Sequence, residues 1–145
     1  MRWIVGTALL LAAALPVCAD LTAARAEANL EKRSKLAMDN AISALHEARE
    51  AYKGGDTPAT TNKVSEVEES VNLVYTSLMQ TGKDPRKSPR WFKYAEIETR
   101  NLLRSLESFQ HDMNFEDRTL LDKTKERVQQ VHDELLTGLM EGKRK

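Results

Sequence analysis

Cysteine is nearly absent from this chain, in which Cys18 is the only one among 145 residues. A single cysteine cannot close an internal disulfide, and it cannot supply the Cys-x-x-Cys-His pattern that attaches haem covalently. The fold must therefore be held together by a hydrophobic core. The residues from Asp20 onward are numerous enough to form one domain with such a core.

Sequence patterns that support catalysis are also missing. None of the three histidines, His46, His111 and His132, has a glutamate three residues before it, as di-iron helical bundles require. The chain contains neither a His-Glu-x-x-His zinc pattern nor a glycine-rich phosphate loop. We therefore expect a protein that is not an enzyme, in which His46 and His111 are solvated helix positions.

Glycine and proline are scarce, with six and four residues, and they fall in a few places. Two breaks contain them, at 54–58 and at 82–89, and a third break lies near 112–114. The segments between these breaks have helical spacing of apolar residues. Helices are expected at about 21–53, 58–81, 89–112 and 115–141.

The apolar stripes of these segments support helices over strands. In the second segment four valines and a leucine step by 3, 4, 3 and 4, whereas a strand requires steps of two. The first segment has a face of alanines, which lets a neighbouring helix approach closely. The stripes are Ala37, Ala41, Ala44, Ala48 and Ala51; Val64, Val67, Val71, Val74 and Leu78; Phe92, Ala95, Thr99, Leu102, Leu106, Phe109 and Met113; Leu121, Thr124, Val128, Val131 and Leu135.

Short breaks between long helices make consecutive helices antiparallel. The sequence therefore predicts an all-α fold, an up-down-up-down four-helix bundle in one domain over residues 20–145. The stretches 67–80 and 128–141 share aliphatic positions and end in Thr-x-Leu-Met. Either the two helical hairpins are repeats of one unit, or two amphipathic helices match by chance.

The only long apolar run is at the N-terminus. Arg2 precedes an uncharged stretch, residues 3–15, that is shorter than the roughly 20 residues that span a bilayer. Small residues precede Asp20, so the pattern predicts a signal peptide of residues 1–19 and an exported protein, periplasmic or secreted. The alternatives are an uncleaved anchor, or a lipid on Cys18, although Val17 is larger than the residue that usually precedes a lipidated cysteine.

No sign of charge prevails, because 22 lysines and arginines balance 22 aspartates and glutamates. The distribution is more informative than the sum. The run KSPRWFKYAE, residues 87–96, mixes aromatic and basic residues, and in the predicted topology it lies at the same end as both termini. This basic end comprises Lys83, Arg86, Lys87, Arg90, Trp91, Lys93, Lys143, Arg144 and Lys145.

A basic end with an exposed tryptophan suits phospholipid headgroups or an acidic envelope polymer, and not nucleic acid, in an exported protein. Trp91 would lie at the level of the headgroups. The alternative is a solvated loop whose charges maintain solubility and complement the C-terminal end of the second helix.

His132 lies on the apolar side of the fourth predicted helix, level with Met38 on the first, and the predicted topology makes these helices neighbours. A methionine and a histidine that face each other resemble the iron ligands of soluble periplasmic haem-b bundle cytochromes, in size, compartment and architecture only. The resemblance implies a haem site at Met38 and His132. The alternative is a half-buried histidine that hydrogen-bonds Tyr75 or Tyr94, with Met38 as core filler.

We expect a non-enzymatic protein of the cell envelope that binds a protein partner or an anionic surface through a helical face or the basic end. A haem or metal carrier is the second hypothesis. The third is a periplasmic helical chaperone or stress protein. For that class the Leu-Thr-x-x-Gln motif is incomplete, because Arg25 stands where the glutamine would be in residues 21–25.

Overall fold

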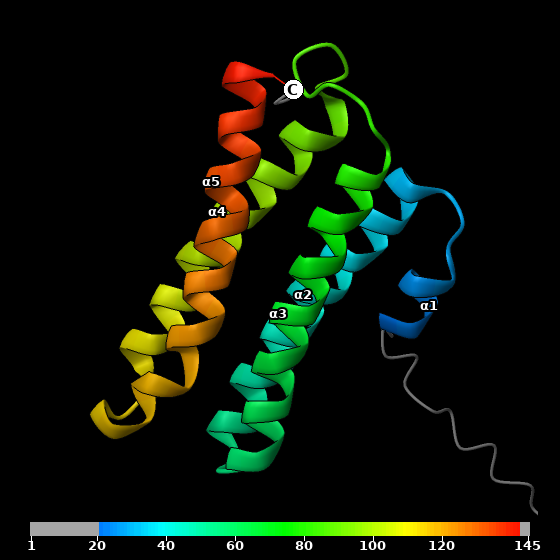
Figure 1. Ribbon diagram of the computed structural model, residues 1–145. Coiled ribbons are helices and arrows are strands. Elements are labelled where there is room, and N and C mark those ends of the chain that lie inside the picture. Colours follow the sequence, from blue (N-terminus) through cyan, green and yellow to red (C-terminus); the bar gives the residue numbers. More distant parts are fainter. Residues whose placement is uncertain (1–20, 143–145) are drawn as a thin grey trace, which may run out of the picture.

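The computed structural model describes residues 21–142. The expected signal peptide and the basic residues Lys143, Arg144 and Lys145 lie outside the described residues. The regular secondary structure of the described range is entirely helical, so the expected all-α class is confirmed (Figure 1). The elements are α1 (Leu21–Ala26), α2 (Leu30–Lys53), α3 (Thr57–Gln80), α4 (Arg90–Asp112), the 3₁₀ helix η1 (Phe115–Leu121) and α5 (Asp122–Glu141).

The four long helices alternate in direction (Figure 1). Helices α2 and α3 form one antiparallel hairpin, and α4 and α5 form another; between the hairpins, α3 packs beside α5 and α2 beside α4. Within residues 21–142, α2 and α5 do not approach each other. The expectation that the first and fourth helices are neighbours is therefore wrong. The loop 81–89 is long enough to carry the chain diagonally across the end of the structure.

The expected first helix, 21–53, is broken at residues 27–29 without glycine or proline. The side chain of Asn29 caps α2 by accepting a hydrogen bond from the backbone N–H of Lys32 at 2.9 Å. The Glu27 carboxylate accepts one from the Asn29 N–H at 3.0 Å. Helix α1 turns back against α2 and α3 and buries Leu21 and Ala24, so it neither overhangs nor continues α2.

The expected fourth helix also begins differently. Residues 115–121 form a 3₁₀ helix, and α-helical geometry starts only at Asp122. Tyr52 of α2 fixes this turn, because its hydroxyl donates to the Asp117 carboxylate and accepts from the Asn114 N–H, each at 2.9 Å. The tip of the second hairpin is thus tied to the end of α2.

Helices α3 and α4 begin and end within one residue of the expected positions. The cap of α3 is Asp56 and not Thr57, since the Asp56 side chain accepts from the Ala59 N–H at 3.0 Å. The four apolar stripes are buried as expected, with only Ala51 half-exposed among them. In the described range, no helix is both long enough and apolar enough to span a membrane.

Candidate functional site

The loop 81–89 and the start of α4 lie beside the C-terminal end of α5 (Figure 1). Pro85 is buried against α5 at Gly138, where an added Cβ would come within 3.2 Å of the proline ring. A side chain at position 138 would therefore push the loop away. Gly142 has a positive φ of 83° and faces Arg86, whose Cδ would lie 3.0 Å from an added Cβ. Gly138 in α5 and Gly142 directly after it thus let the basic loop pack closely.

Asp84 organises this loop from within. Its carboxylate accepts a hydrogen bond from the Arg86 N–H at 2.9 Å. Its carbonyl accepts from the N–H groups of Lys87 and Ser88 at 3.1 and 2.9 Å. The backbone of the loop is therefore defined, which fixes the positions from which its basic side chains extend.

The cations of the loop and of the first turn of α4 are all exposed. Lys83 forms an ion pair with Glu31 of α2, and the Arg90 guanidinium lies over the Trp91 ring, 4.9 Å from its centroid. Arg86, Lys87 and Lys93 form no ion pair within residues 21–142. Their charges are consequently available to an external anion.

Trp91 is half-buried and not fully exposed as the sequence suggested. Its ring packs edge-on against Tyr94, with centroids 6.1 Å apart, and it contacts the hydrophobic core. Burial, with the nearby carboxylate of Asp39 on α2, raises the pKa of Tyr94. The indole is therefore less accessible to a headgroup than the sequence suggested, because part of its surface is covered by the protein.

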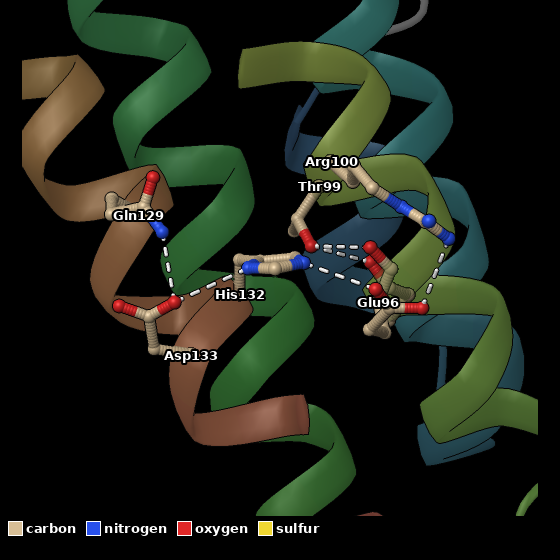
Figure 2. Close-up of polar contacts among 7 residues, drawn as sticks. Glu96, Thr99, Arg100, Gln129, His132 and Asp133 are labelled. Carbon is tan, nitrogen blue, oxygen red and sulfur yellow. Dashed lines mark hydrogen bonds and ion pairs between the residues drawn. The ribbon is translucent and has the colours of Figure 1, made fainter. Parts of the chain in front are cut away.

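His132 lies between α4 and α5, and both of its ring nitrogens are engaged (Figure 2). Nε2 is 3.0 Å from Oε1 of Glu96, and Nδ1 is 3.3 Å from Oδ1 of Asp133. The histidine is half-buried as the alternative reading held, but its partner is Glu96 and neither tyrosine. His46 and His111 are exposed, as expected.

Met38 and His132 are not brought together. Met38 is fully buried on α2, whereas His132 is on α5, which does not approach α2 in the described residues. His132 also has no free ring nitrogen to offer a metal. The structure thus gives no support to a haem site at this pair. Within residues 21–142, three or more potential metal ligands do not cluster anywhere.

Glu96 is a buried carboxylate that the sequence reasoning missed. Its residue exposure is 8 %, and it bonds His132 through one oxygen and Arg100 through the other, the latter at 3.4 Å. Position 96 is four residues after Phe92, on the buried side of the α4 stripe. A glutamate at such a position signals a charged or polar partner on the facing helix.

A groove of about 610 Å³ adjoins the basic end, between α3, the loop and α5. Its aromatic and aliphatic lining includes Tyr75, Met79, Phe92 and Leu135. Charges of both signs border it, Lys83 on one side and Asp133 and Glu134 on the other. The mixed rim gives the groove no clear preference for an anion or a cation.

The opposite end of the structure carries both hairpin turns (Figure 1). These turns contain four acidic residues, Asp56, Asp112, Glu116 and Asp117. In comparisons with known proteins, no family model, no curated protein and no solved structure matches this chain. Its function therefore has to be inferred from its own surface.

Proposed function

We propose that this chain is an exported, non-enzymatic helical-bundle protein that binds an anionic lipid surface through its basic end. One observation carries the proposal: Arg86, Lys87 and Lys93 are exposed on adjoining turns and have no ion-pair partner within residues 21–142. The pattern of residues 1–19 supports export.

Ion pairing separates these cations from exposed lysines of other helices, although Arg104 on α4 is also exposed and is in no ion pair within residues 21–142. Elsewhere exposed lysines such as Lys35 and Lys53 are paired with carboxylates of their own helix, at 2.7 and 3.0 Å. A paired lysine contributes little to the attraction of a distant anion, because the two fields cancel. An unpaired lysine or arginine near an anionic bilayer contributes about 1 kcal/mol.

The rigid attachment of the loop adds to this effect. Asp84 orders the loop from within and Pro85 packs it against α5, so the loop backbone does not need to be ordered when it meets the surface. Beyond Gly142 the sequence continues with Lys143, Arg144 and Lys145. These residues add three positive charges to the sequence directly after Gly142.

The test is sedimentation with vesicles of phosphatidylcholine with and without phosphatidylglycerol, using protein exported with its own N-terminal segment. The variant R86E/K87E/K93E is expected to bind phosphatidylglycerol vesicles at least about 100-fold more weakly, since three attractive charges become repulsive. Wild-type binding should also weaken as salt is raised.

The matched control is K53E/R104E/K123E, which makes the same change in net charge away from the basic end, at exposed positions. It should keep most of the affinity for phosphatidylglycerol vesicles. Equal binding by wild type and by the basic-end variant would contradict the proposal. If both variants lost the same affinity for phosphatidylglycerol vesicles, net charge alone would account for binding. That result would contradict the assignment of binding to the basic end.

A further inference from the structure

Two apolar side chains are exposed on one face of α5 near its C-terminal end. Met140 is 71 % exposed and Leu136 is 40 % exposed. They are four residues apart, so they lie one turn apart on the same face of the helix. Large apolar side chains exposed together near a charged surface mark an interaction site more often than isolated ones do.

The register between α4 and α5 brings these side chains level with Lys93 and Arg90 along the helix axes. His132 faces Glu96 (Figure 2), and Gly142 faces Arg86, so the two helices run antiparallel with a fixed offset. One turn from Glu96 toward the start of α4 is Lys93, and one turn from His132 toward the end of α5 is Leu136. One further turn reaches Arg90 on α4 and Met140 on α5.

We infer that Leu136 and Met140 enter the hydrocarbon boundary of an anionic bilayer when the basic end docks on its headgroups. This inference rests on the proposed function and names the inserted side chains. Amphipathic surfaces bind membranes in this way, with apolar side chains below the headgroups and cations at their level. Charge complementarity favours lipid, because Arg86 and Lys93 need an anionic counterpart beside the apolar one.

The cations Arg86, Lys87, Arg90 and Lys93 outnumber the exposed acidic residues of this part of α5, which are Asp133, Glu134 and Glu141. Asp133 is exposed on α5, but its carboxylate already accepts from Gln129 and contacts the His132 ring. Glu141 is exposed on another face of α5, five residues after Leu136.

Phe115 provides the contrasting case within the same chain. It is 82 % exposed, more than Met140, and it is the first residue of η1, in the turn that joins α4 to α5. That turn lies at the end of the structure opposite the loop 81–89 (Figure 1). The neighbours of Phe115 in sequence include Asp112, Glu116 and Asp117. The Arg118 guanidinium lies over the Phe115 ring, 5.9 Å from the centroid, so one cation offsets part of these acidic surroundings. The acidic residues still outnumber it, so exposure of an apolar side chain alone does not define the insertion site.

The experiment uses single cysteines in a Cys18→Ser background, since Cys18 is the only cysteine of the chain. Met140→Cys and Phe115→Cys are each labelled with the environment-sensitive fluorophore NBD. With phosphatidylglycerol vesicles, the label at position 140 is expected to brighten and shift to shorter wavelength. The label at position 115 should not change, because it stays in water.

A second measurement guards against an effect of the label. L136S/M140S should bind phosphatidylglycerol vesicles at least about tenfold more weakly, with an unchanged salt dependence. The matched control F115S should bind like wild type. Both sites are exposed, so these variants should fold.

The outcomes separate the inference from the proposed function. Insertion would be overturned, and surface binding would stand, if three results were found together. Binding would be salt-sensitive, the fluorescence of the label at position 140 would not change, and L136S/M140S would bind with full affinity. A response at position 140 that persists in R86E/K87E/K93E would support insertion and contradict the role of the cations. Absence of vesicle binding by wild type would overturn both.

Discussion

The two hairpins pack with side chains of different size. In α2–α3 the buried face of α2 contains four alanines, at 37, 41, 44 and 48, and the buried face of α3 contains Ser70 and Ser77 beside its valines. In α4–α5 the buried residues include Phe92, Leu106 and Leu135. Accordingly, α2 and α3 approach each other over more of their length than α4 and α5 do.

Small side chains and close helices favour polar contacts that fix the register. The buried Asn40 of α2 donates to the Ser70 hydroxyl at 2.9 Å and to Glu66 at 3.1 Å, both on α3. In α4–α5 the contact of Glu96 with His132 fixes the register between the two helices. We conclude that the first hairpin resists enlargement of its side chains, whereas the second depends on their bulk.

The largest expected effect is the loss of bulk in the second hairpin. Leu106→Ala removes a fully buried side chain of α4 and leaves a cavity. The free energy of unfolding should fall by about 2–5 kcal/mol, measured by urea denaturation. Leu103→Ala, at a half-buried position of the same helix, should lower it by less than half as much. Equal losses in the two variants would contradict the assigned packing.

Adding side-chain volume to the buried face of the first hairpin should have the next largest effect on stability. Ala41→Leu adds a bulky side chain where the alanine is fully buried, so α2 must shift from its neighbours. The free energy of unfolding should fall by about 1–3 kcal/mol. The control is Ser65→Leu, at an exposed position of α3, which should change it by less than about 0.5 kcal/mol. If Ala41→Leu left the free energy of unfolding unchanged, α2 would be farther from its neighbouring helices than the structure shows.

The buried pair of α4–α5 should show a smaller, compensating effect. His132→Leu leaves the Glu96 carboxylate buried with Arg100 as its remaining side-chain partner, which should lower the free energy of unfolding by about 1–2 kcal/mol. The double variant E96L/H132L should regain most of this loss, because no buried charge is left unpaired. Additive losses in the double-mutant cycle would contradict the coupling.

Much of the fold was predictable because glycine, proline and apolar spacing record it directly. Helices α3 and α4 are bounded by such residues, and their stripes step with the helical repeat because one face contacts the core. The break at 27–29 could not be predicted in this way. It depends on hydrogen bonds of Asn29 and Glu27, which leave no mark on the spacing of apolar residues. The 3₁₀ geometry of η1 has equally weak sequence signals.

The candidate site also contains residues that the sequence predicts and residues that it does not. Its cations were readable from composition, since lysine and arginine on a loop are almost always exposed. The partner of His132 could not be predicted from the sequence, because it depends on which helices are adjacent. The long loop 81–89 permits α5 to lie beside α2 or beside α3. The partial burial of Trp91 was not predicted either, because it depends on the packing of the indole against Tyr94 and the core.

The smallest expected effect concerns Lys63, which links the two helices of the first hairpin. Its ammonium lies 2.7 Å from the Glu47 carboxylate of α2 and 3.0 Å from that of Glu66 on α3. The hydrogen bond with Glu47, chiefly, raises the pKa of Lys63 above its ordinary value of 10.5; Glu66 adds to this, and partial burial opposes it.

Because the pKa of Lys63 is higher in the folded state, its contribution is complete below pH 10.5 and fades as pH rises through the folded-state value. Lys63→Met should therefore lower the free energy of unfolding by up to about 1 kcal/mol at neutral pH. In urea denaturation the difference from wild type should narrow above pH 10.5. Lys53→Met, whose ion pair stays within α2, should have less effect at neutral pH. A difference for Lys63→Met that persists at high pH would assign its effect to packing, and the first hairpin would then depend on side-chain bulk as the second does.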